Sequence, residues 1–271
     1  APRLSRRAPA SEQAKQDIPL GIGPLLSRIA HIAYRHPMAP SPWAWHCIQR
    51  EHSLSHSLSQ EPAPVPDAVA RIAGAMRGFA PPWALCGGWA VDAWLRGITR
   101  EHGDVDLSVF VQDQRALHEH LRGWQLLAHE PGWAPGTHDQ WWDGEHRLSA
   151  STHIHARPPE RTGPMPKYGI ATDEDGFYVE FYLDDRVGDD WVLSRDAPIR
   201  VALRDAVRQS QWGVPAVSPE VLLFFKARDL RRQDKLDFAA LLPRLTDAQR
   251  GWLGEAIALV GHPWLANLSA G

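Results

Sequence analysis

The chain has 271 residues, of which 44% are apolar and 23% charged, and this composition suffices for one large or two modest packed domains. The formal net charge of -3 lacks the strong basic excess of proteins whose main task is to neutralise a nucleic-acid backbone, so a nucleic-acid partner is not expected. Two cysteines are too few for a disulfide framework and favour a reducing compartment, the cytoplasm.

Residues 1–66 differ in composition from the rest of the chain. Proline recurs throughout this stretch, and a run that reads SLSHSLS begins at Ser53. We expect a low-complexity, poorly ordered extension here. A targeting signal is an alternative, because arginines precede an apolar segment, but glycines and a proline interrupt that segment, and a non-functional extension or an overlong start is the simpler interpretation.

A folded domain over residues 67–212 is predicted from a succession of strands and helices. Val69, Ile72 and Met76 fall on one face of a helix that begins after Pro66. Apolar runs and two-residue alternation then predict strands, and helical spacing predicts two more helices. The expected strands are Trp83–Cys86, Val105–Phe110, Trp124–His129, Arg147–His155, Phe177–Leu183, Trp191–Ser194 and Ile199–Leu203, and the expected helices are Trp89–Leu95 and Gln112–Arg122.

Residues 213–271 are predicted to form a helical C-terminal subdomain. Ser218 is a typical N-cap residue, Pro219 suits the first turn, and an apolar helix follows. Further helices are expected over Gln233–Leu241 and Asp247–Val260. The longest wholly apolar run of this part spans only five residues, whereas a bilayer requires roughly 20, so we expect no membrane span.

Two glycines followed by two aspartates form the most informative part of the sequence. Gly87 and Gly88 lie between a predicted strand and a predicted helix, where backbone amides can approach an anion such as a triphosphate. Asp104 and Asp106 are two residues apart on a predicted strand, so both carboxylates project from one face and can share hard cations such as Mg²⁺. Two such ions can hold the attacking and leaving oxygens of a nucleotidyl transfer. Either pair alone is more often a turn or a solvated strand edge.

The order strand, Gly-Gly, helix and Asp-x-Asp strand resembles the nucleotidyltransferase superfamily that includes polymerase beta. The residues between the two pairs resemble the lincosamide and aminoglycoside branch, especially the aminoglycoside 2''-adenylyltransferase type, although their number exceeds the commonest spacing in the superfamily. The resemblance covers roughly residues 67–271 and continues in VEFYL from Val179, SPEVLLFFKA from Ser218, DKLDF from Asp234 and HPWL from His262.

This resemblance implies an α+β fold of the polymerase-beta-like nucleotidyltransferase type, a small mixed sheet flanked by helices with a helical C-terminal subdomain. It also implies ATP as the nucleotide donor, Mg²⁺ as the metal, two ions being expected, and a small acceptor with a hydroxyl group. Some relatives dimerise, so a homodimer is among the expected states. The extension before residue 67 has no counterpart in the family.

A third carboxylate on a neighbouring strand is needed to complete such a site, and Glu180 occupies that position in the resembling segment. It lies in an otherwise apolar strand, where an unpaired acid is costly to bury and a nearby metal would explain it. Many relatives carry aspartate there, which leaves the general-base role of Glu180 open. Asp184 and Asp185 are the competing acids, although their sequence context is that of a turn.

Two basic residues are the expected phosphate ligands. Arg100 lies just before the aspartate pair and can bind phosphate oxygens bidentately, the alternative being a surface ion pair. The resemblance places Lys226 at the nucleotide phosphates, the alternative being a lysine that extends from a buried helix to water. His102 is expected to order the metal-binding loop, and Asp92 to position the glycine pair.

Histidine pairs and tryptophans offer other interpretations. His118 and His120 fall on a predicted helix at a spacing that points them apart, which disfavours a zinc site. His153 and His155 lack accompanying ligands at structural-zinc spacing, and a role at the groove edge or the acceptor site stays open for them. Trp141 and its neighbour, at a predicted strand end and turn, could stack on a base or sugar, although core packing is the commoner use of tryptophan.

The first hypothesis is an Mg-dependent enzyme that transfers AMP from ATP to a hydroxyl group of an aminoglycoside- or lincosamide-like acceptor and releases pyrophosphate. Asp104, Asp106 and Glu180 would hold the metals, and Gly87, Gly88, Arg100 and Lys226 would bind the triphosphate. One alternative keeps the fold but makes a protein or a tRNA the acceptor, as in toxin-like nucleotidyltransferases. The other is a catalytically silent nucleotide-binding module.

Overall fold

The structure is a computed structural model in which all the described residues fall within one compact unit, His31–Gly271. It describes residues 64–95, 97–131, 140–160, 179–193, 199–229 and 231–265. The predicted extension therefore lies almost wholly outside the described residues, and the predicted domain boundaries stay predictions. Within the described part, no helix is both long enough and apolar enough to span a membrane.

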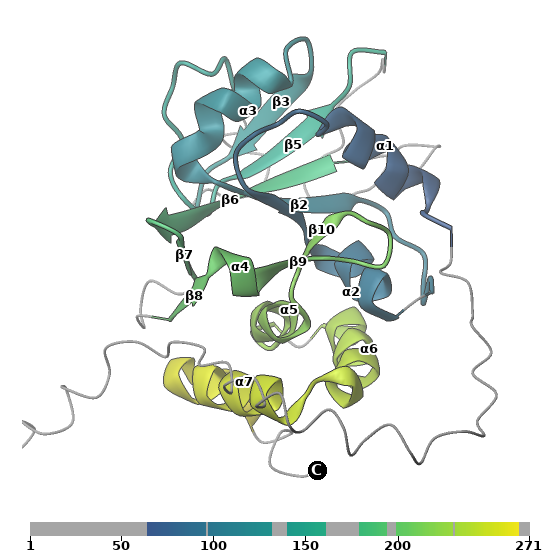
Figure 1. Cartoon of the computed structure of the whole chain (residues 1–271). Coiled ribbons are helices and arrows are strands. Elements are labelled where there is room, and N and C mark those ends of the chain that lie inside the picture. Colours follow the sequence, from purple (N-terminus) through teal and green to yellow (C-terminus); the bar gives the residue numbers. More distant parts are fainter. Residues whose placement is uncertain are drawn as a thin grey trace, which may run out of the picture. The chain divides into compact units, whose positions relative to one another are not determined.

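A ten-stranded mixed sheet forms the centre of this unit (Figure 1). Its main path runs β4-β3-β5-β6-β2-β1-β10-β9, and β7 and β8 extend from β6. The pairs β1·β10 and β2·β6 are parallel, and the other pairs are antiparallel. The strands are β1 Trp83–Leu85, β2 Val105–Phe110, β3 Gln125–His129, β4 Gln140–Trp141, β5 His153–Arg157, β6 Val179–Val187, β7 Asp190–Val192, β8 Arg200–Ala202, β9 Val207–Gln209 and β10 Pro215–Val217.

Helices cover both faces of the sheet, which confirms the predicted α+β class. Helices α1 and α3 lie on one side, where a ring nitrogen of His120 in α3 hydrogen-bonds the Ala75 carbonyl of α1, and α2, α5, α6 and α7 gather on the other side (Figure 1). Helices α5, α6 and α7 form the expected helical C-terminal part. The α-helices are α1 Asp67–Ala75, α2 Gly87–Leu95, α3 Gln114–His120, α4 Leu203–Ala206, α5 Pro219–Lys226, α6 Arg232–Leu241 and α7 Asp247–Val260, and single turns of 3-10 helix are η3 Val111–Asp113 and η4 Leu242–Arg244.

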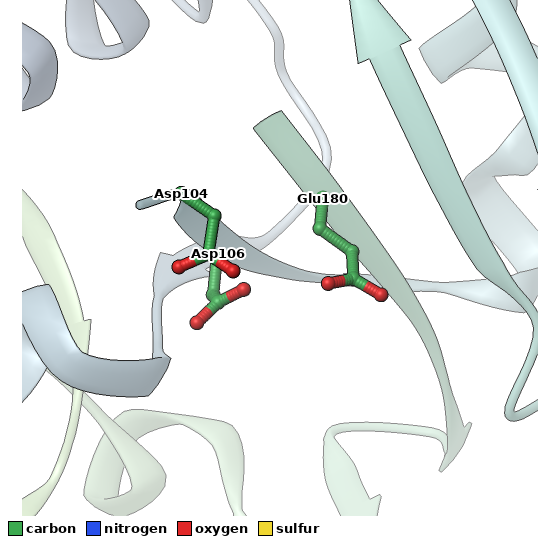
Figure 2. A group of neighbouring side chains, drawn as sticks. All are labelled: Asp104, Asp106 and Glu180. Carbon is green, nitrogen blue, oxygen red and sulfur yellow. The ribbon is translucent and has the colours of Figure 1, made fainter. Parts of the chain in front are cut away.

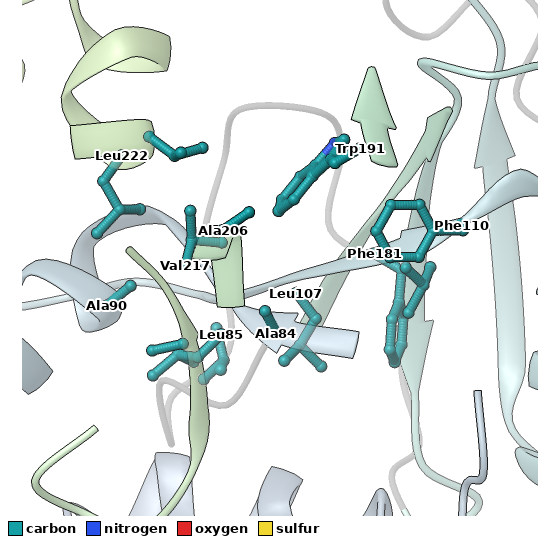
Figure 3. Packing of buried hydrophobic residues seen from close by; sticks show 14 of the residues in the cluster. Ala84, Leu85, Ala90, Leu107, Phe110, Phe181, Trp191, Ala206, Val217 and Leu222 are labelled. Atoms are coloured by element: carbon teal, nitrogen blue, oxygen red, sulfur yellow. The ribbon is translucent and has the colours of Figure 1, made fainter. Parts of the chain in front are cut away.

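The hydrophobic core links the sheet to the C-terminal helices. Leu107 of β2 and Phe181 of β6 are fully buried, as is Val217 of β10, and Figure 3 shows them together with Leu222 of α5. The ring of Trp191 packs edge-on against Phe110, with 5.4 Å between centroids. Because strand residues alternate between faces, burying Leu107 turns its neighbour Asp106 toward the opposite face of β2.

The segment before β5 differs from the prediction. A strand was expected from Arg147, but β5 begins at His153. The backbone of Leu148 is instead bonded by the side chain of Gln114, whose Oε1 accepts from the Leu148 amide at 2.7 Å and whose Nε2 donates to its carbonyl at 3.1 Å. Ser151 then turns the chain with a φ of 67°. A side-chain contact from Gln114 of α3 thus replaces the strand pairing that the sequence pattern predicted.

The segment around Asp184 and Asp185 also differs from the prediction. Both acids were expected in a turn, but β6 continues through them to Val187. Register pairs Phe110 with Asp184 on one side of β6, and Val192 with Asp185 on the other. The chain reverses one residue later, at Gly188, which has a φ of 60°. The predicted turn is therefore present, but it lies further along the chain, at Gly188.

Candidate active site

Three carboxylates converge where β2 and β6 begin. The two strands are parallel neighbours, and their register places Asp106 directly opposite Glu180. Asp104 lies one residue before β2. Each of the three offers one oxygen, and these oxygens all lie within 4.8 Å of one another (Figure 2). The structure thus brings together the three acids that the sequence analysis selected as metal ligands.

The carboxylates form a concentrated negative site. Oδ1 of Asp106 is buried and has no hydrogen-bond partner among the described residues. Burial, followed by the charges of Asp104 and Glu180, raises the pKa of Asp106 well above its ordinary value. Burial and the charge of Glu180 likewise raise the pKa of Asp104. A divalent cation would satisfy the orphaned oxygen and reverse this repulsion, and three clustered carboxylate oxygens are the donors that Mg²⁺ prefers.

Two histidines of β5, the strand paired with β6, contact Glu180. His153 Nδ1 lies 2.8 Å from Glu180 Oε1, and His155 Nε2 lies 3.6 Å from the same oxygen. Burial alone would raise the pKa of Glu180, but the hydrogen bonds and charges of the two histidines lower it to about 2. Glu180 is therefore ionised at neutral pH, as a metal ligand must be. These partners were not foreseen for Glu180, because they depend on the pairing of β5 with β6.

The sequence predicted that the glycine pair precedes the helix, but the two glycines are the first two residues of α2. Gly87 has a φ of 60°, and a Cβ at this position would lie 1.7 Å from Oδ2 of Asp106. A Cβ on Gly88 would lie 2.4 Å from Nη2 of Arg100 and 2.5 Å from Nδ1 of His102. The two glycines thus let three site side chains approach the N-terminus of the helix, where exposed amide groups favour an anion.

The loop between α2 and β2 is organised by Asp92, which is fully buried in α2. Its Oδ1 accepts from Thr99 Oγ1 at 2.5 Å, and its Oδ2 accepts from the Thr99 amide at 3.2 Å. Nε2 of His102 lies 2.6 Å from Oδ2 of the same carboxylate, and the His102 ring packs on Trp89 with 4.2 Å between centroids. These contacts hold the His102 ring in place, in the loop just before the two aspartates.

The two predicted phosphate ligands share one acid of α6. Nζ of Lys226 lies 2.7 Å from Oδ2 of Asp237 and 3.4 Å from Oδ1 of Asp234. Nη2 of Arg100 lies 3.5 Å from Oδ2 of Asp237. Lys226 is 9% exposed, whereas the side chain of Arg100 is 29% exposed and therefore more accessible to a ligand. The DKLDF segment had been recognised in the sequence, but the pairing of its acids with Arg100 and Lys226 had not.

A surface hollow of about 590 Å³ adjoins the site. It is lined by the loop that Asp92 organises and by the first turn of α2, through Trp89, Ile98, Thr99, Arg100, Glu101 and His102. The carboxylates are not part of its lining, and Arg100 connects the two features. The hollow offers an aromatic ring, a cation and loop backbone beside the glycine pair.

His118, His120 and Asp184 were also considered from the sequence, and none of them belongs to the carboxylate cluster. His118 packs on Trp142, with 5.2 Å between ring centroids, whereas His120 bonds to the Ala75 carbonyl, so the two point to different partners as expected. Burial raises the pKa of Asp184 to about 7, even though a hydrogen bond from Ser108 lowers it. Asp184 is not among the three clustered carboxylates, so it is not counted with the candidate metal ligands.

Comparison with known families supports the interpretation of this site. A family model described as Aminoglycoside-2''-adenylyltransferase matches residues 68–132. The matched segment runs from α1 to just beyond β3 and includes the glycine pair, Arg100 and both aspartates. Among curated protein sequences, none matches the chain significantly.

Three solved structures are distant neighbours of the chain. The crystal structure of the lincosamide antibiotic adenylyltransferase LnuA, lincomycin-bound, is 17% identical, with a TM-score of 0.42 over 66% of this chain and 96% of that one. The solution structure of the antibiotic-resistance factor ANT(2'')-Ia is 13% identical, with a TM-score of 0.44 over 74% of this chain and 92% of that one. The crystal structure of ANT(2'')-Ia with adenylyl-2''-tobramycin is 14% identical, with a TM-score of 0.45 over 71% and 95%.

The family match agrees with the order of elements that carries the site. The matched segment contains a strand, a helix that begins with two glycines, and a strand that carries Asp106 and directly follows Asp104. The resemblance predicted from these motifs is therefore confirmed, since residues 68–132 match the family model described as Aminoglycoside-2''-adenylyltransferase.

Proposed function

We propose that this protein is an Mg-dependent adenylyltransferase that transfers AMP from ATP to a hydroxyl group of a small acceptor. The observation that carries the proposal is the cluster of Asp104, Asp106 and Glu180, whose oxygens lie within 4.8 Å of one another. The cluster lies beside the N-terminus of a helix, where an anion is favoured. Carboxylates that can bind metal ions, beside a helix N-terminus that can bind phosphate, suit a metal-bound triphosphate. The scarcity of cysteine supports a cytoplasmic enzyme.

Each residue has an assigned task in the proposal. Asp104, Asp106 and Glu180 would hold two magnesium ions, which when bound would neutralise phosphate charge and align the attacking and leaving oxygens. The amides that Gly87 and Gly88 expose would bind triphosphate oxygens. Arg100, at the mouth of the hollow, would add a bidentate contact to phosphate.

Lys226 would help to fix Asp237, which also contacts Arg100, and would thereby orient both cations toward the triphosphate. This arrangement lets the cations be oriented before the nucleotide binds. Preorganised charge of this kind stabilises a transition state without the cost of reorienting groups during the reaction. Phosphoryl and nucleotidyl transfers depend mainly on such positioning and charge neutralisation.

The reaction itself is a substitution at the α-phosphorus of ATP. The acceptor oxygen forms a new bond to this phosphorus, the bond to the bridging oxygen breaks, and pyrophosphate leaves with that electron pair. The hydroxyl proton passes to a site carboxylate and then to solvent. We assign Glu180 to the metal site, because one of its oxygens lies within 4.8 Å of an oxygen of each aspartate.

An aminoglycoside- or lincosamide-like acceptor is proposed from the family of the matched segment. The test is to incubate the protein with Mg²⁺ and ATP labelled at the α-phosphate, together with panels of aminoglycosides, lincosamides, proteins and tRNA. Label in a small antibiotic supports the proposal. Label in a protein or a tRNA would show that the acceptor is a macromolecule and not a small antibiotic. ATP binding without any labelled product would indicate a catalytically silent nucleotide-binding module. The matched control is Asp104→Asn, which keeps the size of the side chain and removes its charge.

A further inference from the structure

Glu180 sits at the end of a row of polar side chains that crosses three strands. From β3 to β6, the row runs from Nε2 of His129 to Nδ1 of His155, 2.9 Å apart, and from Nε2 of His155 to Oε1 of Glu180, 3.6 Å apart. His153 also contacts this oxygen, with 2.8 Å between its Nδ1 and Oε1 of Glu180. His155 is 1% exposed and Glu180 is 7% exposed, so the row is largely shielded from water.

Hydrogen-bond chemistry identifies the donor to Glu180. An ionised carboxylate only accepts hydrogen bonds, so Nδ1 of His153 donates to Glu180 at 2.8 Å, while Nε2 of His155 lies 3.6 Å from the same oxygen. Nε2 of His129 lies 2.9 Å from Nδ1 of His155, so one of these two ring nitrogens donates to the other. Each member therefore fixes the orientation of the next, and Glu180 stands at the end of the row.

A glutamate needs such support at this site. Its side chain has one more rotatable bond than an aspartate, and freezing that bond costs free energy when a metal binds. The backbone register fixes Glu180 opposite Asp106 but leaves the carboxylate free to rotate away. Both histidines contact Oε1 of Glu180. Figure 2 shows the carboxylate with one oxygen turned toward the aspartates.

We propose that His153, supported by His155 and His129, is a positioning residue that holds Glu180 in the orientation required for metal binding. The inference rests on the proposed function, because it assumes that the three carboxylates bind a divalent ion. His153 acts through Glu180 and does not itself touch the ion. Residues that orient a metal ligand typically change metal affinity by about 10- to 100-fold when they are removed.

The side chain of His153 allows a geometric test. The contact uses Nδ1, and the amide nitrogen of asparagine lies the same number of bonds from the backbone. Glutamine carries its amide one bond further out, near the position of Nε2. His153→Asn should therefore keep the contact, whereas His153→Gln should not. His153→Leu removes the donor while keeping apolar contact with Tyr182, whose ring lies 4.4 Å from that of His153.

The experiment measures the affinity of the nucleotide-free protein for Mn²⁺ by electron paramagnetic resonance, with circular dichroism as the check on folding. We expect His153→Leu and His153→Gln to weaken Mn²⁺ binding by about tenfold, and His153→Asn to stay within about twofold of wild type. His118→Leu is the control, because His118 packs on an aromatic ring away from the carboxylates, and it should bind Mn²⁺ as wild type does.

The possible results separate the two proposals. If Asp104→Asn abolishes Mn²⁺ binding while His153→Leu binds as wild type does, the positioning role is wrong and the metal site stands. If glutamine restores binding and asparagine does not, the contact through Nδ1 is wrong. If wild-type protein binds no Mn²⁺, the metal site and the positioning role both fail. Should the leucine variant not fold, the comparison of asparagine with glutamine decides the question alone.

Discussion

Lys226 and Asp237 form a buried ion pair between α5 and α6, with 2.7 Å between Nζ and Oδ2 and side-chain exposures of 9% and 3%. Asp237 also contacts Arg100, in the loop that precedes β2. One carboxylate of the C-terminal helices thus holds a cation of its own subdomain and a cation beside the carboxylate cluster. The pair connects the stability of the helical part with the electrostatics of the candidate site.

The stability losses from removing each member of this pair should not add up when both are removed. Asp237→Asn leaves the buried ammonium of Lys226 with Asp234 as its remaining acid, and we expect the free energy of unfolding to fall by about 3 kcal/mol. Lys226→Met should also destabilise, since it leaves a buried carboxylate less well paired. The double variant should lose less than the sum of the two, by about 1 kcal/mol or more. Urea unfolding measures all three, and strict additivity would contradict the coupling.

The close approach of Asp106 to Gly87 predicts a loss of activity without a loss of fold. A Cβ on Gly87 would lie 1.7 Å from Oδ2 of Asp106, so Gly87→Ala should displace this carboxylate and lower kcat by about 100-fold or more. Gly188→Ala is the matched control, because Gly188 has the same φ of 60° and nothing within 4 Å of its Cβ position.

The control separates backbone strain from the displaced carboxylate. Gly188→Ala should lose about 1 kcal/mol of stability and keep full nucleotide transfer. Thermal unfolding and a nucleotide-transfer assay on both variants check this. Equal loss of activity in the two variants would mean that strain at a positive φ, and not contact with Asp106, explains the effect of Gly87→Ala.

Asp184 predicts a specific dependence of stability on pH. Burial raises its pKa to about 7 in the folded protein from an ordinary 3.8. The folded state therefore binds more protons than the unfolded state between these values, so this residue lowers the free energy of unfolding as the pH rises from about 4 to about 7. Below that window its contribution is constant, and above it the penalty is complete.

Asp184→Asn removes this titration and keeps the size of the side chain. Relative to wild type, the variant should gain stability as the pH rises from about 4 to about 8, by about 4 kcal/mol. Chemical unfolding at several pH values measures the difference, which cancels the contributions of the other titrating groups. A difference that does not change with pH, or that falls as the pH rises, would show that Asp184 is charged in the folded protein.

Local signals in the sequence predicted the elements that local chemistry determines. Helix α7 spans the predicted Asp247–Val260, because Thr246 and Gln249 form a capping box at its start and Gly261, with a φ of 64°, closes its end. Strand β10 was missed, since it has three residues and its place follows from the parallel pairing of Leu85 with Ala216, far apart in the chain. Ser218 precedes α5 as predicted, but its hydroxyl makes no cap hydrogen bond to the helix.

The candidate site shows the same division between local and long-range information. The glycine pair and the pair of Asp104 and Asp106 could be found because each is a motif of two or three neighbouring residues. The histidines that hold Glu180 could not be assigned to it, because the register of β5 against β6 brings them there. The partner that Arg100 and Lys226 share likewise follows from the packing of α6, which no spacing in the sequence reveals.

The most direct measurement of the central claim compares ATP labelled at the α-phosphate with ATP labelled at the γ-phosphate, using wild-type protein and Asp106→Asn. The account predicts that the acceptor takes up the α-label only, that the γ-label appears in pyrophosphate, and that the variant transfers neither although it remains folded. Transfer of the γ-label to the acceptor, or transfer of the α-label by Asp106→Asn at a rate near that of wild type, would contradict it.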